Sequence, residues 1–175
     1  MALTSITRVD QQSNVPGTKL KITINTMDKV TTPPEFATDS SDATAVQIVT
    51  DIVFSVPAVQ FEFEPLTGKV SGSKKGGHHE LVYEGKIFIP NSAGGLSAKA
   101  NLKRLTNARI IALVPLQNGV NLLAGETYDR PAKMTEVNPD SMKVGEDGTV
   151  EAEVKFVWYS EVPGGAEHTG EFPIA

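Results

Sequence analysis

Three neighbouring residues, His78, His79 and Glu80, come closest in this sequence to a metal-binding motif. Imidazole and carboxylate groups are ordinary zinc ligands. Adjacent residues of a β-strand point to opposite faces, however, so His78 and His79 cannot easily bind one ion together. The remaining histidine, His168, lies far along the chain. The pattern favours structural or solvent-facing histidines, with a metal at a subunit interface as the alternative.

Two glutamate pairs, Glu62 with Glu64 and Glu151 with Glu153, have a spacing that acid–base catalysis could use. Residues two apart on a strand share one face, and the other face of both segments is apolar. That arrangement is typical of the solvated side of a sheet. We predict solvent-facing carboxylates rather than a catalytic pair.

Motifs for phosphate binding and nucleophilic catalysis do not occur in the sequence. It contains neither G-x-x-x-x-G-K-[ST] nor G-x-G-x-x-G, and it has no G-x-S-x-G nucleophile elbow. The chain has no cysteine, which excludes disulfides, thiolate nucleophiles and thiolate zinc sites. We therefore predict a protein that is not an enzyme and has no catalytic, cofactor-binding or metal-binding residues.

The length of 175 residues predicts a single domain, and the net charge is -5. An acidic chain lacks the cationic surplus needed for a nonspecific grip on nucleic acid phosphates. The first residues lack the pattern of an export signal, and no apolar stretch approaches the roughly 20 residues that span a bilayer. These features predict a protein that is soluble as made.

Alternating apolar and polar residues predict several β-strands. In the segment 58–64, Val59, Phe61 and Phe63 share one face, and in the last strand Trp158 ends an apolar face that begins at Val150. Gly85 stands at a position where a bulge could shift the register. The predicted strands span residues 20–25, 46–54, 58–64, 79–89 and 149–159.

One helix and one hairpin complete the predicted elements. Good helix formers follow two glycines over residues 96–105, where Leu102 and Leu105 would lie against a sheet. Two apolar runs, 109–116 and 120–124, flank Asn118-Gly119, which is a strong hairpin signal because both residues tolerate positive φ. The whole pattern predicts an antiparallel β-sandwich or barrel with one short flanking helix.

Several segments are longer than a lone domain needs, and long polar loops are usually functional or disordered. They are the N-terminal segment 1–18, the loop 26–45, a mobile tip at 65–77 with four glycines and three lysines, and a C-terminal arm 160–175. Segments of this kind become ordered when they lie on a neighbouring chain. We expect a protein that works by assembling with other protein chains.

The sequence from Val82 to Met134 resembles structural proteins of tailed bacteriophages, and tail tube subunits in particular. The resemblance depends on Val82–Pro90, on a short helix ending in Leu102-Lys-Arg-Leu105, and on the hairpin around Asn118-Gly119. Its other parts are Ala108–Val114, Leu122–Gly125 and Arg130–Met134.

The resemblance implies a β-sandwich with a flanking helix, whose subunits form rings, usually of six. The sheets join into an inner β-barrel, and the rings stack into a tube that conducts DNA without binding it specifically. The partners would be copies of the chain and other virion proteins, within a virion assembled from proteins made in the host cytoplasm, with no membrane involved.

Acidic strand faces lining such a lumen would repel passing DNA. The candidate lumen residues are Glu62, Glu64, Glu151 and Glu153, although a solvated face explains them equally well. The candidate inter-subunit loop contains Lys74, Lys75, His78 and His79, and its lysines could contact acidic surface of the next ring.

Two other classes of protein fit the same features. A capsid decoration, head–tail connector or tail terminator protein would share the β-domain and the arms. A carbohydrate-binding or adhesin module would need exposed aromatic rings near polar groups in a groove, and Tyr83, Tyr128 and Tyr159 are the candidate rings.

Overall fold

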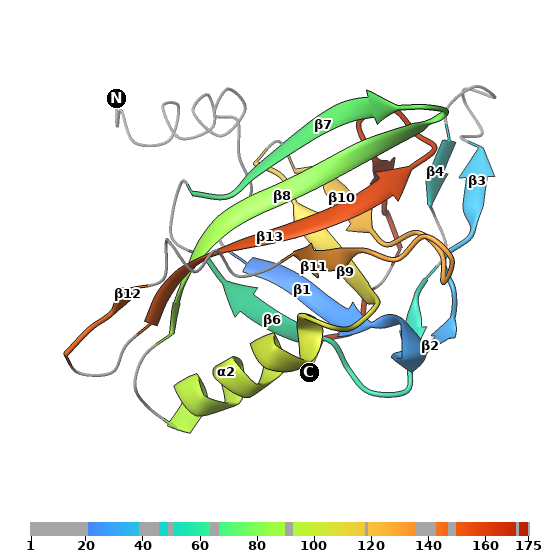
Figure 1. The fold of residues 1–175 in the computed structure, drawn as a ribbon. Helices are drawn as coiled ribbons and strands as arrows, with labels where there is room; N and C mark the ends of the chain where they lie inside the picture. The colour runs from blue at the N-terminus through green and yellow to red at the C-terminus, as the bar shows by residue number, and fades with distance from the viewer. Residues whose placement is uncertain are drawn as a thin grey trace, which may run out of the picture.

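The computed structural model describes residues 21–38, 46–48, 51–63, 67–89, 93–117, 119–135, 143–146, 150–170 and 172–174. Its main body is a sandwich of two antiparallel β-sheets with one α-helix at its flank (Figure 1). The prediction of a mainly β fold with antiparallel sheets and a single helix is confirmed for these residues. The expected N-terminal segment 1–18 lies outside them.

The first sheet has the strand order β14-β10-β9-β1-β6, and the second has β11-β13-β8-β7, with β12 also paired to β13. The first sheet contains β1 (Lys21–Thr26), β6 (Val59–Glu62), β9 (Ile110–Pro115), β10 (Asn121–Ala124) and β14 (Ala166–Glu167). The second contains β7 (Lys69–Lys75), β8 (His78–Ile89), β11 (Lys133–Thr135), β12 (Lys143–Val144) and β13 (Val150–Ser160).

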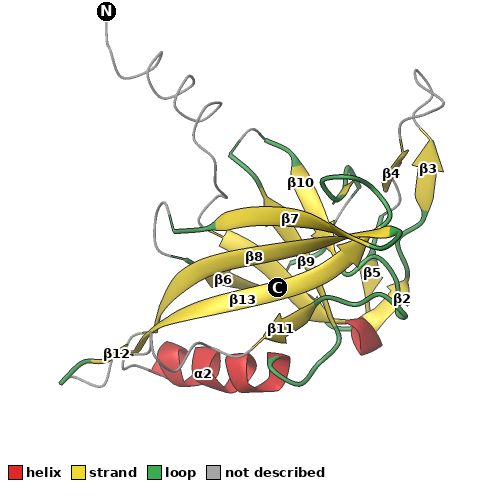
Figure 2. Ribbon diagram, turned by 45° about the horizontal axis from the view of Figure 1, so that its top comes forward, coloured by secondary structure: helices red, strands yellow, loops and turns green. Residues whose placement is uncertain are grey.

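Two small two-stranded sheets, a single-turn 3-10 helix and one α-helix make up the remaining elements. The small sheets pair β2 (Val30–Thr32) with β5 (Val53–Phe54), and β3 (Phe36–Thr38) with β4 (Val46–Ile48). The 3-10 helix is Met27–Lys29, and α2 is Ala93–Leu105. In Figure 2, β3 and β4 extend beyond the sandwich at one end of the molecule and β12 at the other.

The main core fills the space between the two sheets. β8 and β13 pair along their whole length, so that Trp158 opposes Leu81 and Phe156 opposes Tyr83. These side chains are almost fully buried, as the two-residue alternation predicts. Leu105 of α2 joins this core, and Leu102 packs against it.

Gly85 keeps β8 regular instead of forming the bulge considered above. The pairing of β8 with β13 shows no register shift at this residue. A Cβ atom at Gly85 would lie 2.6 Å from the Tyr83 hydroxyl and 2.7 Å from Phe63. Glycine is therefore needed because the Tyr83 and Phe63 side chains occupy this space.

A second core covers the other face of the first sheet. Ile111 and Leu123 point to this side and are fully buried against Met27, Ile52 and Phe172. Their neighbours in this core are Ala58 and Ala166. The C-terminal residues take part directly, because β14 pairs with β10 and the Ala58 N–H donates to the Pro173 carbonyl at 3.2 Å.

Three sequence predictions therefore need correction. The described residues after Tyr159 do not form an arm, because apolar side chains such as Phe172 find a partner on the first sheet. In the described part of the predicted mobile tip 65–77, residues 69–75 form strand β7 and Gly76-Gly77 form the turn that follows it. The predicted strand 46–54 is divided into β4 and β5, and the loop 26–45 contains short strands where it is described.

The predicted hairpin at Asn118-Gly119 is confirmed. β9 and β10 are antiparallel neighbours, and Gly119 has a φ of 91°. The helix is confirmed as well, although it begins at Ala93, and the strands predicted at 79–89 and 149–159 agree with β8 and β13 to within one residue.

Candidate functional site: the outer face of the second sheet

The outer face of the second sheet carries a ladder of ion pairs across β7, β8 and β13, which we call the charge ladder. Glu84 accepts from Lys69 at 2.9 Å and from Lys155 on the other side. Lys75 Nζ lies 2.8 Å from Glu80, and Lys86 lies 3.7 Å from Glu151. Cross-strand neighbours of opposite charge stabilise a sheet modestly, so the ladder fixes the register of this face.

The ladder shifts the pKa values of its members in the directions expected of ion pairs. Hydrogen bonds from Lys155 and then Lys69 lower the pKa of Glu84. Hydrogen bonds from Lys75 and then Tyr159 lower the pKa of Glu80, while the same bond to Glu80 raises the pKa of Tyr159. These glutamates are held as acceptors for their neighbours, which is not the environment of a proton donor at neutral pH.

The candidate lumen residues divide into two groups. Glu151 and Glu153 lie half-buried on this outer face, where Glu151 is paired with Lys86 and Glu153 is the cross-strand neighbour of the same lysine. Glu64 and the side chain of Glu62 lie outside the described part of the molecule. The ion pairs of the charge ladder contain four lysines and three glutamates, and Glu153 on the same face makes the numbers equal, so this surface is charge-balanced rather than acidic.

The candidate inter-subunit residues lie at the ends of two paired strands rather than in a loop. Lys75 opposes His78 and Lys74 opposes His79, on either side of the turn at Gly76-Gly77. Lys74 and His78 are exposed. No group of three or more His, Cys, Asp or Glu among the described residues could hold a metal ion.

An open groove of about 580 Å³ lies where the outer face meets the turn at residues 127–130. The sheet side of the groove includes Tyr159, Glu80 and Lys133, and the turn side includes Arg130 and Asp129. Its other lining residues are Arg109, Pro131, Thr135 and Val157. Tyr159 is 41% exposed, and its hydroxyl donates to Glu80 at 2.7 Å, so the side chain is held in place while part of it stays accessible to solvent.

A buried carboxylate lies behind this groove. Glu126 is 0% exposed, and burial is the main cause that raises the pKa of its carboxyl group. No donor among the described residues reaches its oxygens in good hydrogen-bonding geometry, although the Ser160 hydroxyl and Arg130 lie near enough to favour the charged form. Arg130 itself binds Glu161 at 2.6 Å. Sequence reasoning missed Glu126, because a lone glutamate after an apolar run carries no signal of burial.

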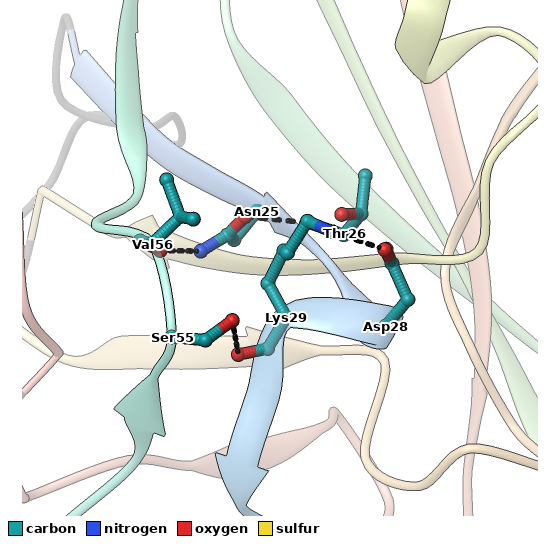
Figure 3. Close-up of polar contacts among 6 residues, drawn as sticks. All are labelled: Asn25, Thr26, Asp28, Lys29, Ser55 and Val56. Carbon is teal, nitrogen blue, oxygen red and sulfur yellow. Dashed lines mark hydrogen bonds and ion pairs between the residues drawn. The ribbon is translucent and has the colours of Figure 1, made fainter.

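A second small pocket, of about 160 Å³, lies between α2 and the end of β1. Beside it, the Asn25 side-chain amide donates to the Val56 carbonyl at 2.8 Å, and the Ser55 hydroxyl donates to the Lys29 carbonyl at 3.3 Å (Figure 3). The Ser55 N–H donates to the same carbonyl at 2.8 Å. These bonds hold residues 55–56 against the 3-10 helix. We assign this region a structural role, since it fastens the segment that covers the first sheet.

No family model, curated protein or solved structure matches this chain. Among the described residues, no helix is long and apolar enough to cross a membrane. Of the three tyrosines considered as ligand contacts, Tyr83 is fully buried, whereas Tyr128 and Tyr159 are exposed.

Proposed function

We propose that this protein is a structural subunit of a bacteriophage tail tube, which self-assembles into stacked rings around a lumen that conducts DNA. The observation that supports this proposal most is that the second sheet has an uncovered face and an unpaired edge among the described elements. Its outer face has no covering layer among the described elements, and its edge strand β7 is paired on one side only. A sheet of this kind can continue into the sheet of a neighbouring copy.

The free edge of β7 offers a regular set of backbone groups. In a two-residue hairpin the residues flanking the turn exchange both hydrogen bonds, and the pattern then alternates along the strand. Lys75 and His78 flank the turn, so the N–H and C=O groups of Val70, Gly72 and Lys74 point away from β8. These three residues are the ones that a neighbouring strand would bind.

Charge favours a head-to-tail contact over a two-fold one. If β7 paired with its own copy about Gly72, Lys69 of one chain would oppose Lys75 of the other. Like charges directly opposite each other destabilise a sheet. A head-to-tail contact avoids this repulsion, and such contacts produce rings or filaments rather than dimers.

The charge ladder is compatible with a surface that DNA passes without binding. Lys75 is paired with Glu80 and Lys86 with Glu151, while Lys69 and Lys155 share Glu84. With Glu153 also near Lys69, four glutamates compensate the four lysines of this face. Counterion release, the main source of nonspecific DNA affinity, needs uncompensated cations. This replaces the simple repulsion expected of an acidic lumen.

Two further features bear on the proposal. The sandwich with one flanking helix agrees with the architecture that the sequence resemblance implies, and β3 and β12, which extend from the body, carry the exposed apolar residues Phe36 and Val144. The C-terminal segment gives no support, because it packs on its own chain. The proposal therefore depends on the second sheet.

Electron microscopy of the purified chain and of two variants at one position tests this proposal. Lys74→Pro removes a backbone N–H that points away from β8, and proline is tolerated at such edge positions. Lys74→Ala removes the charge and keeps the N–H. We expect long tubes from the unaltered chain and from Lys74→Ala, and none from Lys74→Pro, with circular dichroism showing that all three are folded.

Other outcomes identify the alternatives. Closed rings that do not stack would favour a tail terminator or connector. Monomers at high concentration would contradict assembly altogether, and tubes that persist in Lys74→Pro would exclude the β7 edge as the contact.

A further inference from the structure

The groove beside Tyr159 contains charged groups that the fold does not use. Among the residues that the structure describes, no carboxylate lies within ion-pairing distance of Arg109 or Lys133, and no cation lies within that distance of Asp129. The other charges of the groove are compensated, since Glu80 binds Lys75 and Arg130 binds Glu161. Two cations and one carboxylate of the groove therefore have no ion-pair partner in the described part of the molecule.

The positive charge balance of this groove is unusual for a chain with a net charge of -5. The Arg109 guanidinium lies 4.5 Å from the centre of the Tyr128 ring, which holds it in place without neutralising it. Since no ion pair within the described ranges occupies the Arg109 guanidinium, its N–H groups can serve an acceptor in the groove. A guanidinium recognises carboxylates through two parallel hydrogen bonds.

The groove also offers a flat ring surrounded by hydrogen-bonding groups. Tyr159 is fixed through its hydroxyl and remains partly exposed in the groove, while Asp129 and Thr135 supply acceptors and a hydroxyl nearby. A sugar ring matches this combination, since it has an apolar C–H face for an aromatic ring and hydroxyls at its rim for polar groups.

A peptide fits the groove less well. Peptides commonly bind by adding a strand to a sheet edge, and the edge here is β11, which has only three residues. Ala132, just before β11, already exchanges two backbone hydrogen bonds with Ile110, at 2.8 and 2.9 Å. Little backbone is left for a peptide to pair with.

We propose that this groove binds a carboxylate-bearing saccharide, with the sugar ring on Tyr159, the carboxylate between Arg109 and Lys133, and hydroxyls at Asp129. β11 and β7 are opposite edges of the second sheet, so this site does not depend on assembly through β7.

Ligand-observed NMR titration of the full chain with D-glucuronate, with D-glucose as the neutral comparison, tests the site. We expect millimolar binding of glucuronate and at least about tenfold weaker binding of glucose, since a charge-assisted hydrogen bond is lost. Lys133→Gln and Tyr159→Ala should each weaken glucuronate binding about tenfold. Lys103→Gln removes an exposed lysine on α2 and should leave binding unchanged.

Three results would overturn the assignment. One is the absence of glucuronate binding, and another is equal binding by the unaltered chain and by Lys133→Gln, which does not depend on the folding of the tyrosine variant. The third is an Asp/Glu-rich peptide that binds in a Lys133-dependent manner when neither sugar does, which would make the groove a peptide site.

Discussion

The two sheets of this protein differ in how many of their faces are buried. The first sheet is covered on both sides, by the second sheet and by a layer that includes Ile52 and Phe172. The described elements cover the second sheet on one side only, and its other side is the charge ladder. Hence one sheet stabilises the domain, whereas the other presents the surface and the groove that our two functional proposals use.

The same substitution placed on each sheet would test this difference most strongly. Lys at Ile111 would bury an ammonium group without a partner, so we expect Ile111→Lys to unfold the protein at room temperature. Lys at Val157 would join the outer face, and Val157→Lys should cost less than about 1 kcal/mol. Chemical denaturation followed by circular dichroism measures both. If both variants lost a similar amount of unfolding free energy, the outer face of the second sheet would have to be covered.

A glycine pair tests the connection between the sheets. Gly125 has a φ of 86°, and a Cβ there would overlap the Ile110 carbonyl oxygen and lie 2.9 Å from Ala132 N. We expect Gly125→Ala to cost about 3 kcal/mol or more, because strain and overlap add. Gly119 also has positive φ but has open space around it, so Gly119→Ala should cost about 1 kcal/mol. If the two substitutions lowered the free energy of unfolding equally, the backbone at Ile110 and Ala132 would have to be able to move away from the added Cβ atom.

Replacing Glu126 should change the free energy of unfolding by a smaller amount, and this change should depend on pH. Its pKa is raised by burial, so the folded state keeps the proton to higher pH than the unfolded state. Stability from this group is therefore full below the unfolded pKa and is lost as the pH rises through the folded pKa. Glu126→Gln removes the loss, and we expect it to be more stable than the unaltered chain by about 1 kcal/mol at pH 8.

The control for Glu126 is the exposed Glu167, whose replacement by Gln should change the free energy of unfolding by less than about 0.5 kcal/mol. Urea denaturation at pH 5 and pH 8 measures both variants. A Glu126→Gln variant that is destabilised at pH 8 would mean that the ionised carboxylate supports Arg130.

The charge ladder should give the smallest effect. Glu84→Gln breaks two ion pairs whose lysines are 64% and 40% exposed, so we expect a loss below about 1 kcal/mol. The pKa of Glu84 is lowered in the folded state, so its contribution is present at neutral pH and is lost as the pH falls through that value. The loss should also shrink in about 1 M salt. A larger loss that persists in salt would assign the ladder a role in stability.

The two long strands of the second sheet, β8 and β13, could be predicted from local pattern alone. From Val150 to Phe156, apolar and polar residues alternate strictly, and this alternation places Phe156 in the core and Glu151 outside. The hairpin at Gly119 could be predicted for the same reason, because positive φ is a local requirement. The apolar run Ile110–Val114 predicts burial but not which layers cover it.

The C-terminal segment and the groove could not be predicted in this way. Phe172 stands among polar residues and glycines, and its burial depends on a contact with Phe54, whose ring centre lies 4.9 Å away. Arg109, Asp129 and Tyr159 are each unremarkable in the sequence. They meet in one groove only because β13 and the turn at 127–130 lie side by side.

The sequence by itself determined the long strands β8 and β13, the hairpin at Gly119 and which side of these strands is apolar, because these depend on a two-residue repeat and on local backbone preferences. Only the tertiary structure decided that the first sheet is covered twice, that the tail packs on its own chain, and that Glu126 is buried behind Arg130. Those outcomes depend on which surfaces, far apart in the sequence, pack together and exclude water. Local sequence pattern does not specify such long-range contacts.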